Sequence, residues 1–215
     1  YKTFMWPKNM WKVYEYFIRK GGGLGISPKE PDPDHYDKIN IHCDVLVVGG
    51  GPAGLAAALQ AGRSGARVII ADEQNEFGGQ LLSGRELIDG APAMKWVSSI
   101  IGELAELKEV RLFPRSTVFG YYDHNFLALI QRLTNHLKKD DQDSPRERIW
   151  RIRAKQVILA TGAIERPLIF PNNDRPGVML ASAVSTYLNR YAVISGIQPL
   201  IFTNNDSAYQ TALDL

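Results

Sequence analysis

Three glycines, at positions 49, 51 and 54, have the spacing G-x-G-x-x-G and are the residues of this sequence best suited to bind a phosphate. Gly49 permits a tight turn out of a strand, and Gly51 lacks the Cβ that would keep a pyrophosphate away from the backbone. Gly54 lets the following helix pack closely on the strand. Pro52 stands at the start of that helix, and the amides around Ala53 would point at phosphate oxygens, where the helix dipole favours an anion.

An acidic residue completes the pattern: Asp72 stands 18 residues after Gly54. At the end of a second strand, its carboxylate can accept hydrogen bonds from the ribose hydroxyls of adenosine. Glu73 and Gln74 follow where the chain would pass the adenine half of a dinucleotide. A carboxylate here repels a 2′-phosphate, which favours NAD or FAD over NADP. The alternative is a glycine-rich turn that binds no ligand.

The elements needed to position these residues are indicated by the sequence around them. The Val-rich run 43–48 is bounded by glycine and predicts a buried strand of a parallel sheet. A helix of small residues is expected from Pro52 to about Ser64 and is ended by Gly65. The run 68–71 predicts a second buried strand, which gives a βαβ unit of about 30 residues.

Further elements are expected after this unit. A helix is predicted from Ala93 to Leu107, because its apolar residues recur at helical spacing. The run 110–122 predicts one strand. The other predicted elements are a segment at 126–137 that is ambiguous between strand and helix, a charged turn at 138–148, and strands at 149–152, 156–160 and 200–203. The last of these strands, with a helix start at Ser207, would begin a second βα unit.

The predicted fold is α/β: a Rossmann-like dinucleotide-binding domain with a parallel sheet and an inserted β-meander, plus the start of a second dinucleotide-binding domain. We expect an aromatic N-terminal segment and linker at 1–38, the NAD-binding domain at 39–167, and a connection with a truncated second domain at 168–215. The N-terminal aromatic residues would pack on the rest of the protein or on a partner. The sequence begins without Met and ends in a predicted helix, so we expect further sequence at both ends.

The composition narrows the class of protein. With 45% hydrophobic and 22% charged residues the chain is an ordinary globular protein, and its net charge of +2 gives no support for a nucleic-acid partner. No apolar run approaches the roughly 20 residues that cross a bilayer, and there is no signal-peptide pattern, so a cytoplasmic location is expected. The single cysteine, Cys43, is expected to be buried and inert. The four histidines lack metal-ligand spacing and there is no C-x-x-C pair, so no metal site and no catalytic residue are predicted.

Two further motifs resemble those of two-domain flavoprotein disulfide reductases. Gly79 and Gln80 belong to a G-G-Q motif that follows Asp72 at a typical distance, and Thr161 and Gly162 belong to an A-T-G motif at the end of a predicted strand. In that superfamily both motifs are places where the backbone approaches the dinucleotide. The resemblance also implies that the backbone of Val118 lines an adenine pocket, although the residue is equally well explained as a core valine.

Longer strings resemble a narrower family, the α subunit of heterotetrameric sarcosine oxidase. They are the aromatic segment at Trp6-Pro7, PRSTVFGYYDHN at 114–125, ATGAIERP at 160–167, NNDRPGVMLASA at 172–183 and TNNDSAY at 203–209. The resemblance extends over nearly the whole chain. It implies a two-domain reductase-like subunit fused to an aminomethyltransferase-like C-terminal domain, which this sequence does not contain.

The family resemblance implies a role in a larger oxidoreductase. Such an enzyme demethylates sarcosine oxidatively to glycine, formaldehyde or 5,10-methylenetetrahydrofolate, and hydrogen peroxide. The α subunit holds NAD without a catalytic role, and it assembles with β, γ and δ subunits. FAD and FMN lie on or near a partner subunit, which also takes the small-molecule amine substrate, and tetrahydrofolate binds in the absent C-terminal domain. The segment alone is therefore expected to be inactive.

Two other functions fit the same residues. An FAD-binding subunit of an amine or opine dehydrogenase shares the glycine-rich, G-G-Q and A-T-G-A motifs. A nucleotide-free segment that only serves as a scaffold for partner subunits is the third possibility.

Overall fold

The computed structural model describes residues 6–25, 27–137 and 144–215. The chain divides into two compact units, Tyr1–Asp34 and His35–Leu215. The middle of the charged turn predicted at 138–148 lies outside the described residues.

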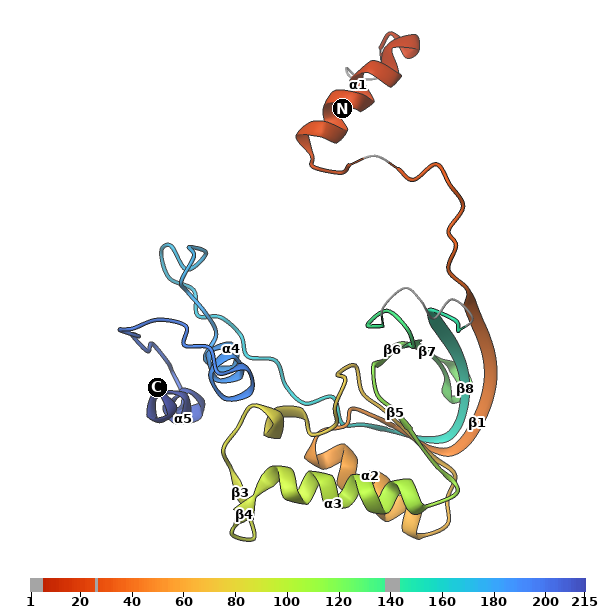
Figure 1. The fold of residues 1–215 in the computed structure, drawn as a ribbon, viewed down its shortest axis with the longest axis vertical. Coiled ribbons are helices and arrows are strands. Elements are labelled where there is room, and N and C mark those ends of the chain that lie inside the picture. Colours follow the sequence, from red (N-terminus) through yellow and green to blue (C-terminus); the bar gives the residue numbers. More distant parts are fainter. Residues whose placement is uncertain (1–5, 26, 138–143) are drawn as a thin grey trace. The chain divides into compact units, whose positions relative to one another are not determined.

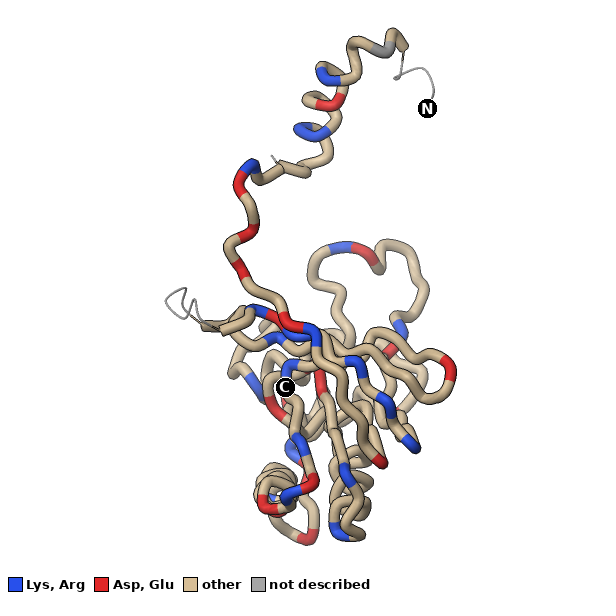
Figure 2. The backbone as a smooth tube through the Cα atoms, turned by 90° about the vertical axis from the view of Figure 1, so that its right-hand side faces the viewer, with Lys and Arg blue, Asp and Glu red and all other residues tan. Residues whose placement is uncertain are grey.

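The N-terminal unit contains one α-helix. A 3-10 turn, η2 (Lys8–Met10), leads into α1 (Trp11–Gly21). Figure 2 shows both signs of charge along this helix. None of the residues of α1 is buried, and the side chains of Tyr16 and Phe17 contact each other edge to face at 5.4 Å between ring centroids.

The second unit is built on a six-stranded sheet with the strand order β5-β2-β1-β8-β7-β6 (Figure 1). The four strands from β5 to β8 in this order run parallel, and β8, β7 and β6 form an antiparallel meander. The strands are β1 (Tyr36–Val48), β2 (Val68–Ala71), β5 (Val110–Phe113), β6 (Ser116–Tyr122), β7 (Phe126–Arg132) and β8 (Glu147–Leu159). This confirms the predicted α/β class with a parallel sheet and an inserted meander.

Helices and short turns complete the unit. Helix α2 (Pro52–Arg63) connects β1 to β2, and α3 (Ala93–Glu106) lies beside it (Figure 1). The left-handed φ of +81° at Gly65 follows α2, as predicted. The remaining elements are η3 (Gly79–Leu82), β3 (Leu87–Ile88), β4 (Ala91–Pro92), η4 (Asp123–Asn125), α4 (Ala181–Ser185), the π-helical turn η5 (Thr186–Arg190), η6 (Asp206–Ala208) and α5 (Tyr209–Asp214).

The strands β1 and β8 are longer than the sequence predicted. β1 begins at Tyr36, so the end of the expected linker is strand, and β8 joins the two strands predicted at 149–152 and 156–160. The two strands pair with each other from Tyr36↔Glu147 to Val48↔Leu159, which supplies backbone partners to residues whose side chains are exposed. Asp44 and Lys155 are not paired in this register, but their side chains form an ion pair at 2.9 Å.

Two other predicted strands were wrong. The single strand expected at 110–122 is two strands, because Pro114 has no N–H to donate and Arg115 takes a left-handed φ of +55° between them. No strand forms at 200–203: Leu200 is 95% exposed and no neighbouring strand among the described residues offers hydrogen bonds there. The helix start expected at Ser207 is confirmed by η6 and α5.

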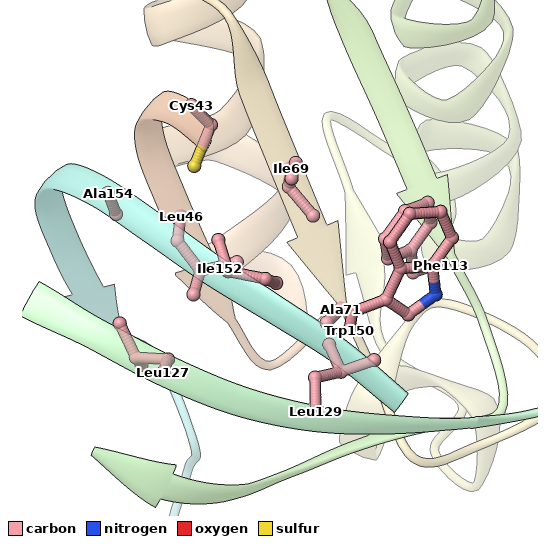
Figure 3. Packing of buried hydrophobic residues seen from close by; sticks show 10 residues of the cluster. All are labelled: Cys43, Leu46, Ile69, Ala71, Phe113, Leu127, Leu129, Trp150, Ile152 and Ala154. Atoms are coloured by element: carbon pink, nitrogen blue, oxygen red, sulfur yellow. The ribbon is translucent and has the colours of Figure 1, made fainter. Parts of the chain in front are cut away.

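Hydrophobic residues are buried on both faces of the sheet, which explains the unbroken apolar runs of β1 and β2. On one face the helix cluster joins alternate strand residues to α2 and α3: Val45, Val47, Leu55, Ala58, Leu59, Val68, Ile70, Phe77, Val97 and Leu104. On the other face the meander cluster joins the intervening strand residues to β7 and β8 (Figure 3): Cys43, Leu46, Ile69, Ala71, Phe113, Leu127, Leu129, Trp150, Ile152 and Ala154. Trp150 stacks on Phe113 at 4.8 Å and donates its indole N–H to Gln131.

The buried thiol of Cys43 gives a test of this packing. Burial, reinforced by the charge of Asp44, raises the pKa of Cys43 to about 11. At neutral to mildly basic pH the native thiol should therefore carry at least about 100-fold less thiolate than an unfolded cysteine, and alkylate correspondingly more slowly. Iodoacetamide labelling followed by peptide mass spectrometry would measure this rate. Ser98→Cys, at an exposed position of α3, is the control that should label rapidly; equal rates at both positions would contradict the buried environment.

Candidate functional site

At Gly49 and Gly54, beside the turn between β1 and α2, a side chain would clash with backbone atoms of the protein itself. Gly49 has a φ of +106°, and a Cβ there would overlap the carbonyl oxygen of Ala160. A Cβ at Gly54 would overlap the carbonyl oxygen of Gly49. These overlaps are with backbone atoms, which cannot rotate away, so the turn, the helix and the end of β8 can come together only without side chains.

Gly51 is different, because none of the residues that the structure describes requires its lack of a side chain. Its φ of −74° is ordinary, and a Cβ would meet only the Cα of Gly79 at 3.8 Å, an ordinary contact. The first turn of α2 has no side-chain cap and no acidic residue. Pro52 and Ala53 are exposed there. The arrangement leaves the N-terminus of α2 accessible to an anion.

The Asp72 side chain lies against this turn. One carboxylate oxygen accepts the Gly50 N–H at 2.6 Å and the other accepts the Gln74 N–H at 2.8 Å. Each carboxylate oxygen can accept more than one hydrogen bond, so acceptor capacity is left for ribose hydroxyls. The sequence pattern pointed to a ligand contact alone; the structure adds that Asp72 also holds the turn and the start of the following loop.

The G-G-Q motif lies on the other side of the turn. The Gly78 N–H donates to the carbonyl of Gly50 at 2.8 Å. Gly79 has a φ of +58°, and a Cβ there would come within 2.8 Å of the Cα of Gly51. Gln80 is exposed beside it. The structure thus brings the two glycine motifs into backbone contact.

The A-T-G motif lies at the end of β8. The Ala160 N–H donates to the carbonyl of Val48 at 2.8 Å, and the Thr161 amide nitrogen would lie 3.2 Å from a Cβ on Gly49. Thr161 is exposed, as is Gly162, whose φ is +70°. Both residues therefore stand at the rim of the same turn.

Val118 lies on β6, at one end of the strand order. Its side chain packs against the meander cluster. Two residues earlier, the Ser116 N–H donates to the carbonyl of Asp72 at 2.7 Å, which holds the start of β6 beside the predicted ribose contact. The side chain is thus a core valine, and a backbone role for Val118 stays a prediction.

Beyond Asp72 the chain borders a cavity of about 490 Å³ that the sequence did not predict. It is lined by Glu73, Gln74, Asn75, Arg115, Arg132, Asn135 and His136. Two of these lining residues contact each other: the Arg132 guanidinium donates to the carbonyl of Glu73 at 3.0 Å. The arginines escaped prediction because Arg115 and Arg132 belong to segments far along the sequence, and only the meander brings them to the loop after β2.

The chemistry that this arrangement offers is binding. It combines an open helix N-terminus for phosphates, an aligned carboxylate for hydroxyls and a polar cavity beside them. Among the described residues no group of three or more His, Cys, Asp or Glu is placed to hold a metal ion. Within the same residues, no helix combines the length and apolarity needed to traverse a membrane.

The different reasons for Gly51 and Gly54 predict different responses to one added methyl group. Gly54→Ala should lower the free energy of unfolding by about 1–3 kcal/mol through the clash with Gly49, although alanine is the better helix former. Gly51→Ala should leave it nearly unchanged. Urea denaturation would measure both, with Gly102→Ala on α3 as the control where a Cβ meets nothing. The packing assignment fails if Gly54→Ala is as stable as Gly102→Ala.

Comparisons with known proteins agree with this geometry. Residues 44–133 match the family of FAD-dependent oxidoreductases. Among solved structures, L-proline dehydrogenase from P. horikoshii superposes with a TM-score of 0.58 at 26% sequence identity, over 78% of this chain and 31% of that one. The chain therefore shares part of the fold of this dehydrogenase over most of its own length.

Two curated relatives are similar in sequence over long stretches. The α subunit of sarcosine oxidase from Rhizobium meliloti (strain 1021) is 50% identical over 100% of this chain and 22% of its own length. One subunit of the opine oxidase of Agrobacterium tumefaciens (strain Ach5) is 34% identical over 74% of this chain and 33% of its own. The chain thus spans about a fifth of the first relative, and its similarity to the second extends over a third of that protein.

Proposed function

Since the chain is related over its whole length to a segment of sarcosine oxidase α subunits, which are oxidoreductases, we propose that it forms the nucleotide-binding domain of one of these proteins and holds NAD. The predicted resemblance to that family is confirmed by 50% identity. The observation that carries the binding role is the combination at one turn: Gly51 lacks a side chain for no internal reason, and Asp72 stands beside it.

The residues fit an adenine dinucleotide. The backbone at Gly51 and the N-terminus of α2, with Pro52 and Ala53, would receive the pyrophosphate. The Asp72 carboxylate would accept hydrogen bonds from the ribose hydroxyls. Glu73 and Gln74 line the cavity that would lie beside the adenosine half. Gly79, Gln80, Thr161 and Gly162 would supply backbone close to the nucleotide. NAD can accept a hydride at its nicotinamide, but in this proposal the domain only binds it, and no residue here is assigned to catalysis.

The rest of the proposal concerns the whole enzyme. The complete α chain would assemble with β, γ and δ subunits into a cytoplasmic heterotetramer. Sarcosine would be oxidised on a partner, where FAD and FMN lie, and a C-terminal domain would pass the one-carbon unit to tetrahydrofolate. The support for this is the 50% identity to a sarcosine oxidase α subunit over the whole of this chain.

FAD is the second candidate for the same site. It is favoured by the match of residues 44–133 to FAD-dependent oxidoreductases and by the similarity to an opine oxidase subunit. The pyrophosphate and adenosine ribose are common to both nucleotides, so the described contacts accept either.

Identification of the nucleotide tests the proposal directly. Acid extraction of the purified protein should release an adenine nucleotide identified as NAD by mass spectrometry, and the protein should lack the yellow absorbance of flavin. A yellow protein that releases FAD would establish the second candidate. Gly51→Val is the matched control: it should fold but release no nucleotide, since its side chain would occupy the place of the pyrophosphate. An extract without adenine nucleotide, from protein that also fails to bind added NAD, contradicts both.

Substitution of Asp72 tests the ribose contact. Asp72→Ala removes a charged acceptor, and such hydrogen bonds contribute about 1.5–3 kcal/mol each, so NAD affinity should fall about tenfold to several hundredfold. NADP, which Asp72 repels, should lose less or gain. Calorimetric titration of both nucleotides would measure this, with Glu106→Gln at the exposed end of α3 as the control. NAD affinity of Asp72→Ala within about twofold of the original would exclude the assignment.

A further inference from the structure

The segment after α4 makes contacts that the nucleotide-binding motifs do not explain. Helix α4 continues into η5, a π-helical turn ending at Arg190. Turns of this kind are rare in proteins, and those that do occur are often found at functional sites. Together with Ser185, the last residue of α4, this turn contacts two places in the loop between β2 and β3, about 100 residues earlier in the sequence.

The first place is Ser83, at the end of the G-G-Q turn. Its carbonyl accepts the Ser185 hydroxyl and the Asn189 amide, both at 3.0 Å. Its hydroxyl lies 3.1 Å from that of Thr186. Three side chains of one short helical segment thus meet a single residue that follows η3.

The second place is the loop that begins immediately after Asp72. The Arg190 guanidinium donates to the side-chain oxygens of Gln74 at 3.3 Å, Asn75 at 3.1 Å and Glu76 at 3.0 Å. The Arg190 side chain is 14% exposed and that of Glu76 is 60% exposed. The Arg190 guanidinium is therefore largely buried and makes charge-assisted hydrogen bonds to three consecutive residues of this loop.

Between these two places, the same loop contacts the glycine turn. The Gly78 N–H donates to Gly50, and Gly79 packs on Gly51. On the side of the cavity, Arg132 donates to the Glu73 carbonyl. The Arg115 N–H also donates to the carbonyl of Gln74 at 2.8 Å, so the loop is held by the glycine turn, by Arg115, by Arg132 and by η5. Of these, η5 belongs to the C-terminal part of the chain.

We infer that Arg190 is a positioning residue for the nucleotide site, which holds the loop 73–76 in the shape that receives the adenosine half of the dinucleotide. This rests on the proposed function. Arg190 would contact no nucleotide itself; it would act through the Gln74–Glu76 side chains, next to the residue proposed to bind the ribose. The segment 181–190 would thereby couple the C-terminal part of the chain to nucleotide affinity.

The experiment compares NAD and ADP-ribose binding by calorimetry in the complete protein and in Arg190→Gln. Both affinities should fall by the same factor, about threefold to thirtyfold, the usual range for a residue that acts through others. Arg190→Lys keeps the charge but not the fork, and should recover part of the loss. Arg175→Gln, at an exposed arginine of the preceding segment, is the matched control and should bind like the original protein.

The outcomes separate the two proposals. If the original protein binds neither NAD nor ADP-ribose, the proposed function fails. If it binds both and Arg190→Gln binds them equally well, the positioning role is overturned. Should Arg190→Gln unfold, Glu76→Ala decides, because it removes one acceptor at an exposed position: weaker binding of both ligands with unchanged thermal stability supports the role, and unchanged binding overturns it.

Discussion

The approach of backbone to backbone at the β1–α2 turn is the constraint on which the rest of the structure depends. Gly54 lies against the carbonyl of Gly49, and Gly49 lies against the carbonyl of Ala160. These two contacts bring the start of α2 onto the sheet and place the end of β8 beside it. The helix cluster can close only with α2 in this position, since Leu55 and Ala58 belong to it. The open N-terminus of α2 is a consequence of the same packing.

The βαβ unit could be predicted because its signals are local. Glycine spacing, apolar runs and the helix-ending Gly65 lie within a short stretch and do not depend on distant residues. The lengths of β1 and β8 could not be predicted in this way. Tyr36 is exposed and becomes part of a strand because Glu147 pairs with it, and sequence patterns do not show such a partner.

The candidate site shows the same division. The motif assigned Gly51 and Asp72 to one dinucleotide site, but it did not show that the Asp72 carboxylate also accepts the Gly50 N–H. The cavity arginines and Arg190 come from segments that only the folded chain brings to the loop after Asp72. The strand expected at 200–203 failed for the converse reason: its apolar pattern is suitable, but pairing requires a neighbour. Local chemistry is visible in sequence, and contacts between distant segments are not.

The two long strands have a consequence for how the second unit unfolds. The first half of β8 pairs with β7 of the meander, the second half of β1 pairs with β2, and β1 and β8 pair with each other along almost their whole length. Opening the meander would remove hydrogen bonds from β8, whose partner β1 contributes Val45 and Val47 to the helix cluster. Both hydrophobic clusters therefore depend on the paired strands β1 and β8. We expect slow hydrogen exchange along the whole length of β1, up to its end beside the glycine turn, because the second unit should unfold as a single cooperative unit.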